Sequence, residues 1–253
     1  MPNARDDMET IVHPVSGVQF GIMSPDVIRK MSVAEIFTQE TYEGNIPKIG
    51  GLFDPRMGVL EHNMRCPTDN LNNMDCPGYF GHITLAAPVF NYQFITYIVK
   101  ILKCVCPRCS TLKIECDGPM HERRETAFKL YVKACSKSKI AVCRNCGFTF
   151  PTNVSKNPNM IHELVAKFGT TNLVSWTPSD VLKIFQTMTD ADCETIGLNP
   201  KRCRPEWLIY TVFPVGPPSM RPSVKQDNNT RMEDDLTHKL CDIVKTNRVL
   251  QNK

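Results

Sequence analysis

Apolar residues recur at helical spacing in three stretches of the chain. The first stretch follows Pro88 and contains Phe90, Phe94, Ile98, Ile101, Leu102 and Val105. The second begins at residues 177–180 and places Val181, Leu182, Phe185 and Met188 on one face. The third follows a capping box at residues 230–233 and carries the apolar Leu236, Leu240, Ile243 and Val244, with the polar Asn247 at the same spacing. Each pattern predicts an amphipathic helix that packs on a core.

Four shorter signals predict further elements. Residues 18–22 alternate apolar with small or polar side chains, which predicts a short strand. Residues 24–26 supply a capping serine, a proline and an acid, so a helix is expected to begin there. A capping box at residues 32–35 predicts another helix start. Residues 122–135 are compatible with a further helix.

Two segments lack any regular period. Residues 44–81 are rich in Gly, Pro, Asn and Asp, and we expect a loop-dominated region there that needs help from elsewhere to stay ordered. Residues 214–222 hold several prolines, which fix φ and lack N–H donors. This segment is therefore expected to be a rigid extended connector, neither helix nor interior strand.

The composition is that of an ordinary soluble globular protein. The chain has 253 residues, of which 42% are hydrophobic and 22% charged, and its formal net charge is +4. Residues 1–8 contain no apolar signal core. The most apolar stretch, residues 94–105, is interrupted by two lysines and is too short to span a bilayer. We expect no membrane association, and reduced cysteines instead of a disulfide scaffold.

Two Cys-x-x-Cys pairs carry the clearest chemistry. Cys106 and Cys109 form the first pair, and Cys143 and Cys146 form the second. This spacing predicts two tight turns whose sulfurs meet on one tetrahedral zinc ion, with a structural role because all four positions are filled. A redox Cys-x-x-Cys is the alternative, although it usually occurs once in a βαβ context. The unpaired cysteines are interpreted as core or surface residues: Cys104, Cys116, Cys135, Cys193, Cys203 and Cys241.

The segment around these pairs is basic. Residues 100–146 contain eleven lysines and arginines against four acids. A positively charged, metal-bound module is typical of proteins that bind nucleic acid through its phosphates. The sequence does not single out which of these cations contact DNA.

Six segments together resemble the N-terminal region of the largest subunit of multisubunit DNA-dependent RNA polymerases, nearest to the eukaryotic RNA polymerase II type. They occur in the family's order and cover the chain from about residue 15 to its end: residues 18–25, 48–58, 76–82, 204–208, 214–223 and 233–240. Departures from the family pattern are also compatible with a divergent or viral lineage.

The resemblance implies an α+β fold: an irregular multi-helix clamp lobe with small β elements and a zinc-stapled clamp head. We expect a flexible N-terminus at residues 1–16, the clamp head with its zinc module at 17–175, and the start of the clamp core at 176–253. In the family this lobe closes over template DNA and the RNA–DNA hybrid. The expected partners are therefore the nucleic acid, the remainder of the largest subunit, the second-largest subunit and the other polymerase subunits.

The resemblance also assigns cofactors. It matches Cys106, Cys109, Cys143 and Cys146 to one of the family's clamp zinc sites. In the other site the family has Cys at the positions of Cys66, Asp69 and Cys76 and His at that of Tyr79, so two of its four ligands are replaced here. His82 could take over as a ligand, which gives a second, weaker candidate site of Cys66, Asp69, Cys76 and His82. We expect one zinc per chain.

The chain has no Asn-Ala-Asp-Phe-Asp-Gly-Asp motif to hold catalytic magnesium. It is therefore expected to belong to a nucleotidyltransferase without being catalytic alone, with magnesium only in the complete polymerase. The alternative function is a free-standing zinc-containing DNA-binding transcription regulator. The expected location is the nucleus for a cellular protein, and the virion or the host cytoplasm or nucleus for a viral one.

Overall fold

The structure is a computed structural model, and it describes residues 15–18, 20–44, 46–158, 160, 162–225 and 231–252. The α-helices are α1 (Pro25–Met31), α2 (Ile95–Leu102), α3 (Arg124–Lys137), α4 (Pro178–Gln186), α5 (Asp190–Ile196) and α6 (Asp235–Gln251). The strands are β1 (Ala34–Glu35), β2 (Tyr42–Glu43), β3 (Ile46–Pro47), β4 (Gly81–Phe90), β5 (Asn153–Lys156), β6 (Leu164–Phe168), β7 (Asn172–Trp176), β8 (Ile209–Val215), β9 (Val224–Lys225) and β10 (Arg231–Met232). Short 3₁₀ turns are η1 (Pro55–Met57), η2 (Tyr92–Phe94), η3 (Pro205–Leu208) and η4 (Pro218–Met220). This mixture confirms the α+β class.

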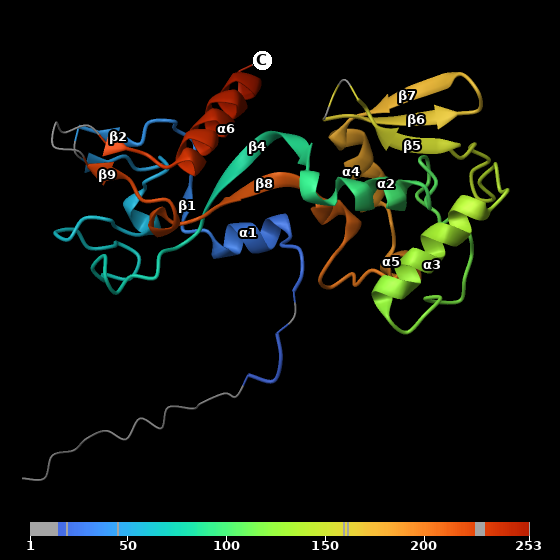
Figure 1. The fold of residues 1–253 in the computed structure, drawn as a ribbon, viewed down its shortest axis with the longest axis horizontal. Helices are drawn as coiled ribbons and strands as arrows, with labels where there is room; N and C mark the ends of the chain where they lie inside the picture. The colour runs from blue at the N-terminus through green and yellow to red at the C-terminus, as the bar shows by residue number, and fades with distance from the viewer. Residues whose placement is uncertain are drawn as a thin grey trace, which may run out of the picture.

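Two lobes are joined by the long antiparallel pair of β4 and β8 (Figure 1). One lobe holds α2 to α5 and the antiparallel sheet β5-β6-β7, and it contains the larger hydrophobic core. The other holds β1 to β3, β9, β10 and α6, with a smaller core that includes Ile36, Leu52 and Val244. β1 extends the linking sheet by pairing in parallel with β4, so the order is β1-β4-β8.

Local capping explains where several helices begin. The Ser24 side chain accepts a hydrogen bond from the Val27 N–H at 3.1 Å, and Pro25 occupies the first turn of α1. Thr177 and Asp180 form a complete capping box at the start of α4. Both helices therefore begin where the sequence predicts. The helix expected at residues 122–135 is α3, which begins two residues later.

The linking sheet contains a break that α6 fills. The register of β4 against β8 shifts between Thr84 and Val89, which leaves backbone groups of β4 without a strand partner. The Asn247 side chain of α6 donates to the Thr84 carbonyl at 2.8 Å and accepts from the Ala86 N–H at 2.7 Å. One amide side chain thus replaces two ladder hydrogen bonds and fixes α6 on the sheet.

The segment 44–81 is mostly irregular, as predicted, and buried polar groups hold it. The Asp54 carboxylate is fully buried and accepts from the Gly50 N–H at 2.6 Å, from the Arg56 N–H at 3.0 Å and from the Arg56 guanidinium at 2.7 and 2.9 Å. Arg221 is also buried and donates to the Leu52 carbonyl at 2.5 Å and to the Gly216 carbonyl at 3.1 and 3.2 Å. These hydrogen bonds stabilise the irregular segment, and those from Arg221 connect it to the C-terminal part of the chain.

Some predicted elements are wrong. No strand forms among the described residues of 18–22: the Ile22 N–H makes a single backbone bond, to the Arg202 carbonyl, so no ladder develops. The capping box at 32–35 does not start a helix, because Ser32 ends α1 and Ala34 and Glu35 pair with β4. In the helix expected after Pro88, Phe90 instead ends β4, and the α-helix begins only at Ile95.

Two corrections concern the C-terminal region. The connector 214–222 is not extended throughout: Pro214 lies in β8, and residues 218–220 form a 3₁₀ turn. Because β8 is an edge strand, a missing N–H at Pro214 is tolerated there. α6 is capped by Asp234 and not by the predicted box, whose Thr230 lies outside the described residues. Leu236, expected on the inner face of α6, is 61% exposed.

Residues on both sides of the expected boundary at 175/176 contribute to the larger core. This core joins Leu164 and Ala166 on one side of the boundary to Val181 and Phe185 on the other.

Within the described residues, no helix is both long enough and apolar enough to cross a membrane.

Candidate metal centre beside a basic surface

Two loops with the same backbone bonding present the four cysteines. In the first, the Ser110 N–H donates to the Cys106 carbonyl at 2.9 Å and the Cys106 N–H donates to the Thr111 carbonyl at 2.9 Å. In the second, Gly147 and Phe148 make the equivalent bonds to Cys143, at 2.9 and 2.8 Å. Each loop is thus a tight turn that exposes both sulfurs of its Cys-x-x-Cys pair on one side. We call such a turn a knuckle.

Each knuckle needs a residue with positive φ directly after its second cysteine. Gly147 adopts φ +69° and Ser110 adopts φ +57°, a conformation that costs free energy for a residue with a Cβ. Ser110 is held there by its side chain, which donates to the Ile184 carbonyl of α4 at 2.6 Å. The first knuckle is therefore attached to α4. This role of Ser110 was not predicted from sequence, although its position in the first knuckle matches that of Gly147 in the second.

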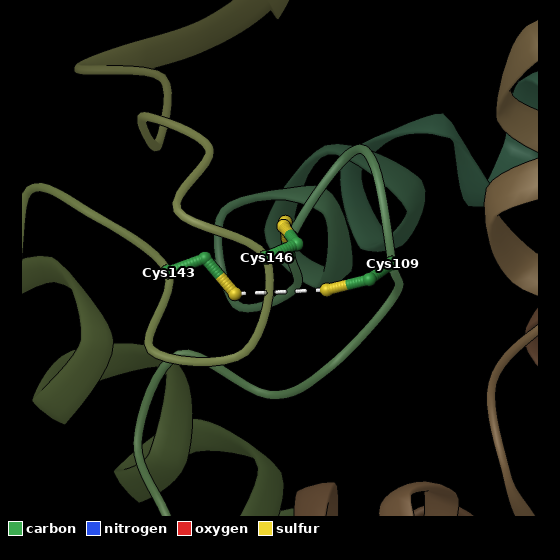
Figure 2. Close-up of side chains that lie close together, drawn as sticks. Cys109, Cys143 and Cys146 are labelled. Carbon is green, nitrogen blue, oxygen red and sulfur yellow. Dashed lines mark hydrogen bonds between the residues drawn. The ribbon is translucent and has the colours of Figure 1, made fainter.

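The four sulfurs lie at tetrahedral spacing. Sγ of Cys106 is 3.5 Å from Sγ of Cys146, and Sγ of Cys109 is 3.6 Å from Sγ of Cys143. All four sulfurs lie within 4.8 Å of one another. Zn–S bonds of about 2.3 Å in a regular tetrahedron require sulfurs roughly 3.8 Å apart. Figure 2 shows Cys109 and Cys143 facing each other across the gap between the two loops. The structure therefore brings together the four cysteines predicted from sequence, at distances compatible with one shared zinc ion.

The surroundings of the cluster favour a thiolate at one position and a thiol at another. Burial opposes ionisation of Cys109, but hydrogen bonds from the Thr111 hydroxyl and N–H outweigh it and lower the pKa of Cys109 to about 6. Burial raises the pKa of Cys106 to about 12. A cation that binds all four sulfurs must therefore displace protons, as zinc does on binding thiols. Phe150 and Ile140 pack against the cluster.

Cys66 begins a third knuckle. The Asn70 N–H donates to the Cys66 carbonyl at 2.7 Å, and the Cys66 N–H donates to the Leu71 carbonyl at 2.9 Å. Asn70 adopts φ +59°, at the place of Ser110 in the first knuckle. Asp69 therefore stands where the other two knuckles have their second cysteine. Cys76 completes a group in which one ligand atom each from Cys66, Asp69 and Cys76 lie within 4.8 Å.

Hydrogen-bond donors converge on the carboxylate of this third knuckle. Asp69 accepts from the Leu71 N–H at 2.9 Å and from the Tyr79 hydroxyl at 3.1 Å. Burial opposes its ionisation, but those bonds and further ones from the thiols of Cys76 and Cys66 hold the pKa of Asp69 below its usual value. Burial, together with Asp69, raises the pKa of Cys76 to about 12. The carboxylate thus lies at the centre of a hydrogen-bonded group that also contains both cysteine thiols.

His82 lies apart from this group. It belongs to β4, its Nδ1 is hydrogen-bonded to the Ser32 hydroxyl at 2.7 Å, and burial lowers its pKa. It is not among the ligand atoms gathered at Cys66. The six remaining cysteines are free thiols, and none belongs to a potential metal cluster within the described part of the chain.

Several basic residues of the module lie around the cysteine cluster without a carboxylate partner. Arg144 pairs with Glu115 at 3.4 Å and Lys129 with Glu125 at 2.5 Å, both exposed pairs that contribute little to stability. Lys103, Lys113 and Lys139 form no ion pair with a described acid. The basic character predicted from sequence therefore remains available to an external anion.

Comparison with known proteins places the chain in a family. Residues 12–253 match the family model described as RNA polymerase Rpb1, domain 1. The chain is similar to the DNA-directed RNA polymerase subunit Rpo1N of Methanocaldococcus jannaschii, at 39% identity over 94% of this chain and 18% of the relative. It is also similar to the Rpo1N subunits of Sulfolobus acidocaldarius, at 38% over 94% of this chain, and of Thermococcus celer, at 37% over 97%. It spans 28% of each of these two relatives. The three relatives are archaeal, so they support the N-terminal region of a largest subunit without favouring the polymerase II type or a viral lineage.

Proposed function

Because the chain belongs to the RNA polymerase Rpb1 domain 1 family, we propose that it works as the clamp module of a DNA-directed RNA polymerase largest subunit. The observation that carries this proposal is the match over residues 12–253, which leaves no room for a second unrelated domain in that range. The module closes over template DNA and the RNA–DNA hybrid during transcription. It contributes to nucleotidyl transfer by holding nucleic acid, while the magnesium-binding residues belong to another part of the polymerase.

The zinc at Cys106, Cys109, Cys143 and Cys146 has a structural role in this proposal. All four positions of a tetrahedral ion are filled by sulfur, so none is open to substrate. The ion joins cysteines that are far apart along the chain: Cys109 and Cys143 are 34 residues apart, and Cys106 and Cys146 are 40 residues apart. It thereby fixes α3, which lies between them, and the basic residues that this segment carries. Zinc binding contributes folding free energy to the lobe.

The third knuckle holds no metal in this proposal. It has only two cysteines, and in place of the family's other two ligands it has Asp69, a hard oxygen ligand, and Tyr79, a poor metal ligand near neutral pH. The hydrogen bonds to the Asp69 carboxylate give the loop the order that a metal would provide. One zinc per chain is the expected content.

A double variant tests this assignment of one zinc. Asp69→Cys with Tyr79→His restores a Cys-x-x-Cys knuckle and an imidazole at the last position, so the chain should bind a second zinc. Asp75→Cys is the control, because it adds an exposed cysteine to the same loop outside the knuckle and should leave the content at one. Two zinc ions in the unaltered chain, measured by atomic absorption, would contradict the assignment.

The expected partners follow from the whole polymerase. They are template DNA, the RNA–DNA hybrid, the remainder of the largest subunit and the second-largest subunit. The head at residues 17–175 and the start of the clamp core at 176–253 remain the proposed division of the chain. A polymerase II type, a viral lineage and a nuclear or viral location rest on the sequence resemblance alone, and the archaeal relatives do not support them.

Affinity purification separates this function from that of a free-standing regulator. A tag on the protein in its own cells should recover the second-largest subunit in equal amount, together with promoter-independent RNA synthesis on a tailed template. A regulator would instead be recovered without polymerase subunits and would retard DNA in a gel by itself. The second result would overturn the clamp assignment.

A further inference from the structure

An open pocket lies beside the cysteine cluster, and no carboxylate lines it. Its volume is about 620 Å³, within the range of ligand pockets. The walls come from the end of α2, the end of α3, the segment after the second knuckle and the turn between β6 and β7. Its polar lining is given by Lys103, Lys113, Lys139, Ser136, Ser138, Thr149, Thr152 and Asn153.

The three lysines make this pocket positive. None of them pairs with a described acid, and no aspartate or glutamate is among the lining residues. Lys113 is anchored: its Nζ donates to the Cys135 carbonyl near the end of α3 at 3.3 Å and lies 5.5 Å from the centre of the Phe150 ring. Lys103 and Lys139 form no ion pair or cation–π contact with the part of the chain that the structure describes, so both are available to a ligand.

Hydroxyl groups add hydrogen-bond donors next to the cations. The Ser138 hydroxyl oxygen accepts from the Ile140 N–H at 3.2 Å, which leaves its own hydrogen to donate. Ser136 and Thr152 already donate to backbone carbonyls, so they shape the wall instead. Phe150 and Ile140 line the pocket and also pack on the cysteine cluster, so the pocket and the metal centre share these two side chains.

We propose that this pocket binds phosphate groups. Lysine is a common phosphate-binding residue that acts as a point charge, and three lysines attract a doubly charged phosphate more strongly than a singly charged carboxylate. Serine and threonine hydroxyls beside lysines are the usual contacts of a nucleic-acid backbone. The volume accommodates more than one phosphate, so the source is either a nucleic-acid backbone or a free polyphosphate. Binding of a nucleic-acid backbone rests on the proposed function, whereas binding of inorganic phosphate does not.

Matched double variants test the pocket in the full, zinc-loaded chain. Lys103→Gln with Lys139→Gln removes two cations from the pocket and leaves the anchored Lys113 in place. The control, Lys133→Gln with Lys245→Gln, removes two exposed cations, one on α3 and one on α6, neither of which lines the pocket. Both variants change the net charge equally, and zinc content should stay at one in each.

The first measurement uses inorganic phosphate at constant ionic strength, followed by amide chemical shifts. The unaltered chain and the control should show saturable shifts at residues 136–141 and 149–153, and the pocket variant should lose them. Acetate at the same ionic strength should produce none. Shifts that are absent, that are equal with acetate, or that persist in the pocket variant would overturn the proposal.

The second measurement identifies the source of the phosphate. If it is a nucleic-acid backbone, a short DNA duplex competes with inorganic phosphate for the pocket, and the slope of log K against log salt becomes shallower by roughly 1 to 2 in the pocket variant relative to the control. If DNA binding is the same in both variants while phosphate binding is lost, the pocket serves a free polyphosphate. Equal loss of phosphate binding in both variants would contradict a site at this place.

Discussion

Asp54→Asn is expected to loosen the irregular segment 44–81 more than any other single change of charge in it. An amide keeps one acceptor oxygen, so two of the four hydrogen bonds to the Asp54 side chain are lost whichever way the amide turns. A hydrogen bond to a charged group contributes about 1.5–3 kcal/mol. Because the Arg56 side chain is 42% exposed and can turn to water, we discount its share and expect a total loss of about 3 kcal/mol.

The assay is urea unfolding at neutral pH in the presence of zinc, followed by circular dichroism. Asp75→Asn is the matched control, because Asp75 lies in the same segment, is exposed, and should change the free energy of unfolding by no more than about 0.5 kcal/mol. Hydrogen exchange should show faster exchange of the Gly50 amide in Asp54→Asn. Identical unfolding midpoints for the two variants would refute the reasoning that a buried carboxylate organises this segment.

Single contacts also determine the effects of pH and of substitutions at Ser110, Arg221 and Cys143. The free energy of unfolding should differ between the unaltered chain and Asp54→Asn above the ordinary aspartate pKa of 3.8, and the difference should shrink as the pH falls through the lower pKa of Asp54 in the folded chain. A carboxylate with a lowered pKa loses its stabilising effect when it is protonated. Urea unfolding of both proteins at a series of pH values measures this. Ser110→Ala should destabilise the zinc-loaded chain by about 1–2 kcal/mol in urea unfolding, because alanine keeps a Cβ at positive φ and loses the hydrogen bond to Ile184. Ser110→Gly should cost less, because glycine adopts positive φ without strain. Equal losses in the two variants would show that φ has no role. Arg221→Lys should be more destabilising than Arg221→Met in thermal unfolding, since lysine keeps a buried charge and cannot reach both carbonyls. The reverse order would show that keeping one donor outweighs the cost of the buried charge. Cys143→Ser should abolish zinc binding and unfold the larger lobe, and unchanged zinc content by atomic absorption would exclude Cys143 as a ligand.

The helices with strong local signals could be predicted from sequence, and the sheet could not. α1 and α4 begin at capping residues whose side chains bond within their own first turn, so distant contacts hardly matter. β4 carries Ala86, Ala87 and Pro88 in its bulged part, where the alternation of apolar and polar residues is lost. Its partner β8 contains Pro214, which local rules assign to a connector.

The same contrast explains the remaining errors. Ser32 and Glu35 have the spacing of a capping box, but the parallel pairing of Ala34 with Gly81 removes residues 34–35 from helical conformation. The cysteine cluster was predictable because its ligands come in two local turns. The hydrogen-bonded group at Asp69 was not, since it depends on Tyr79 and Cys76 folding back onto the knuckle.

The central claim is that four sulfurs hold one zinc ion and thereby fix the basic lobe. X-ray absorption at the zinc edge, combined with metal content, tests it most directly on the purified chain. We predict one zinc per chain with four sulfur neighbours at about 2.3 Å and no nitrogen or oxygen ligand. A folded chain without metal, or a first coordination shell containing nitrogen or oxygen, would contradict it.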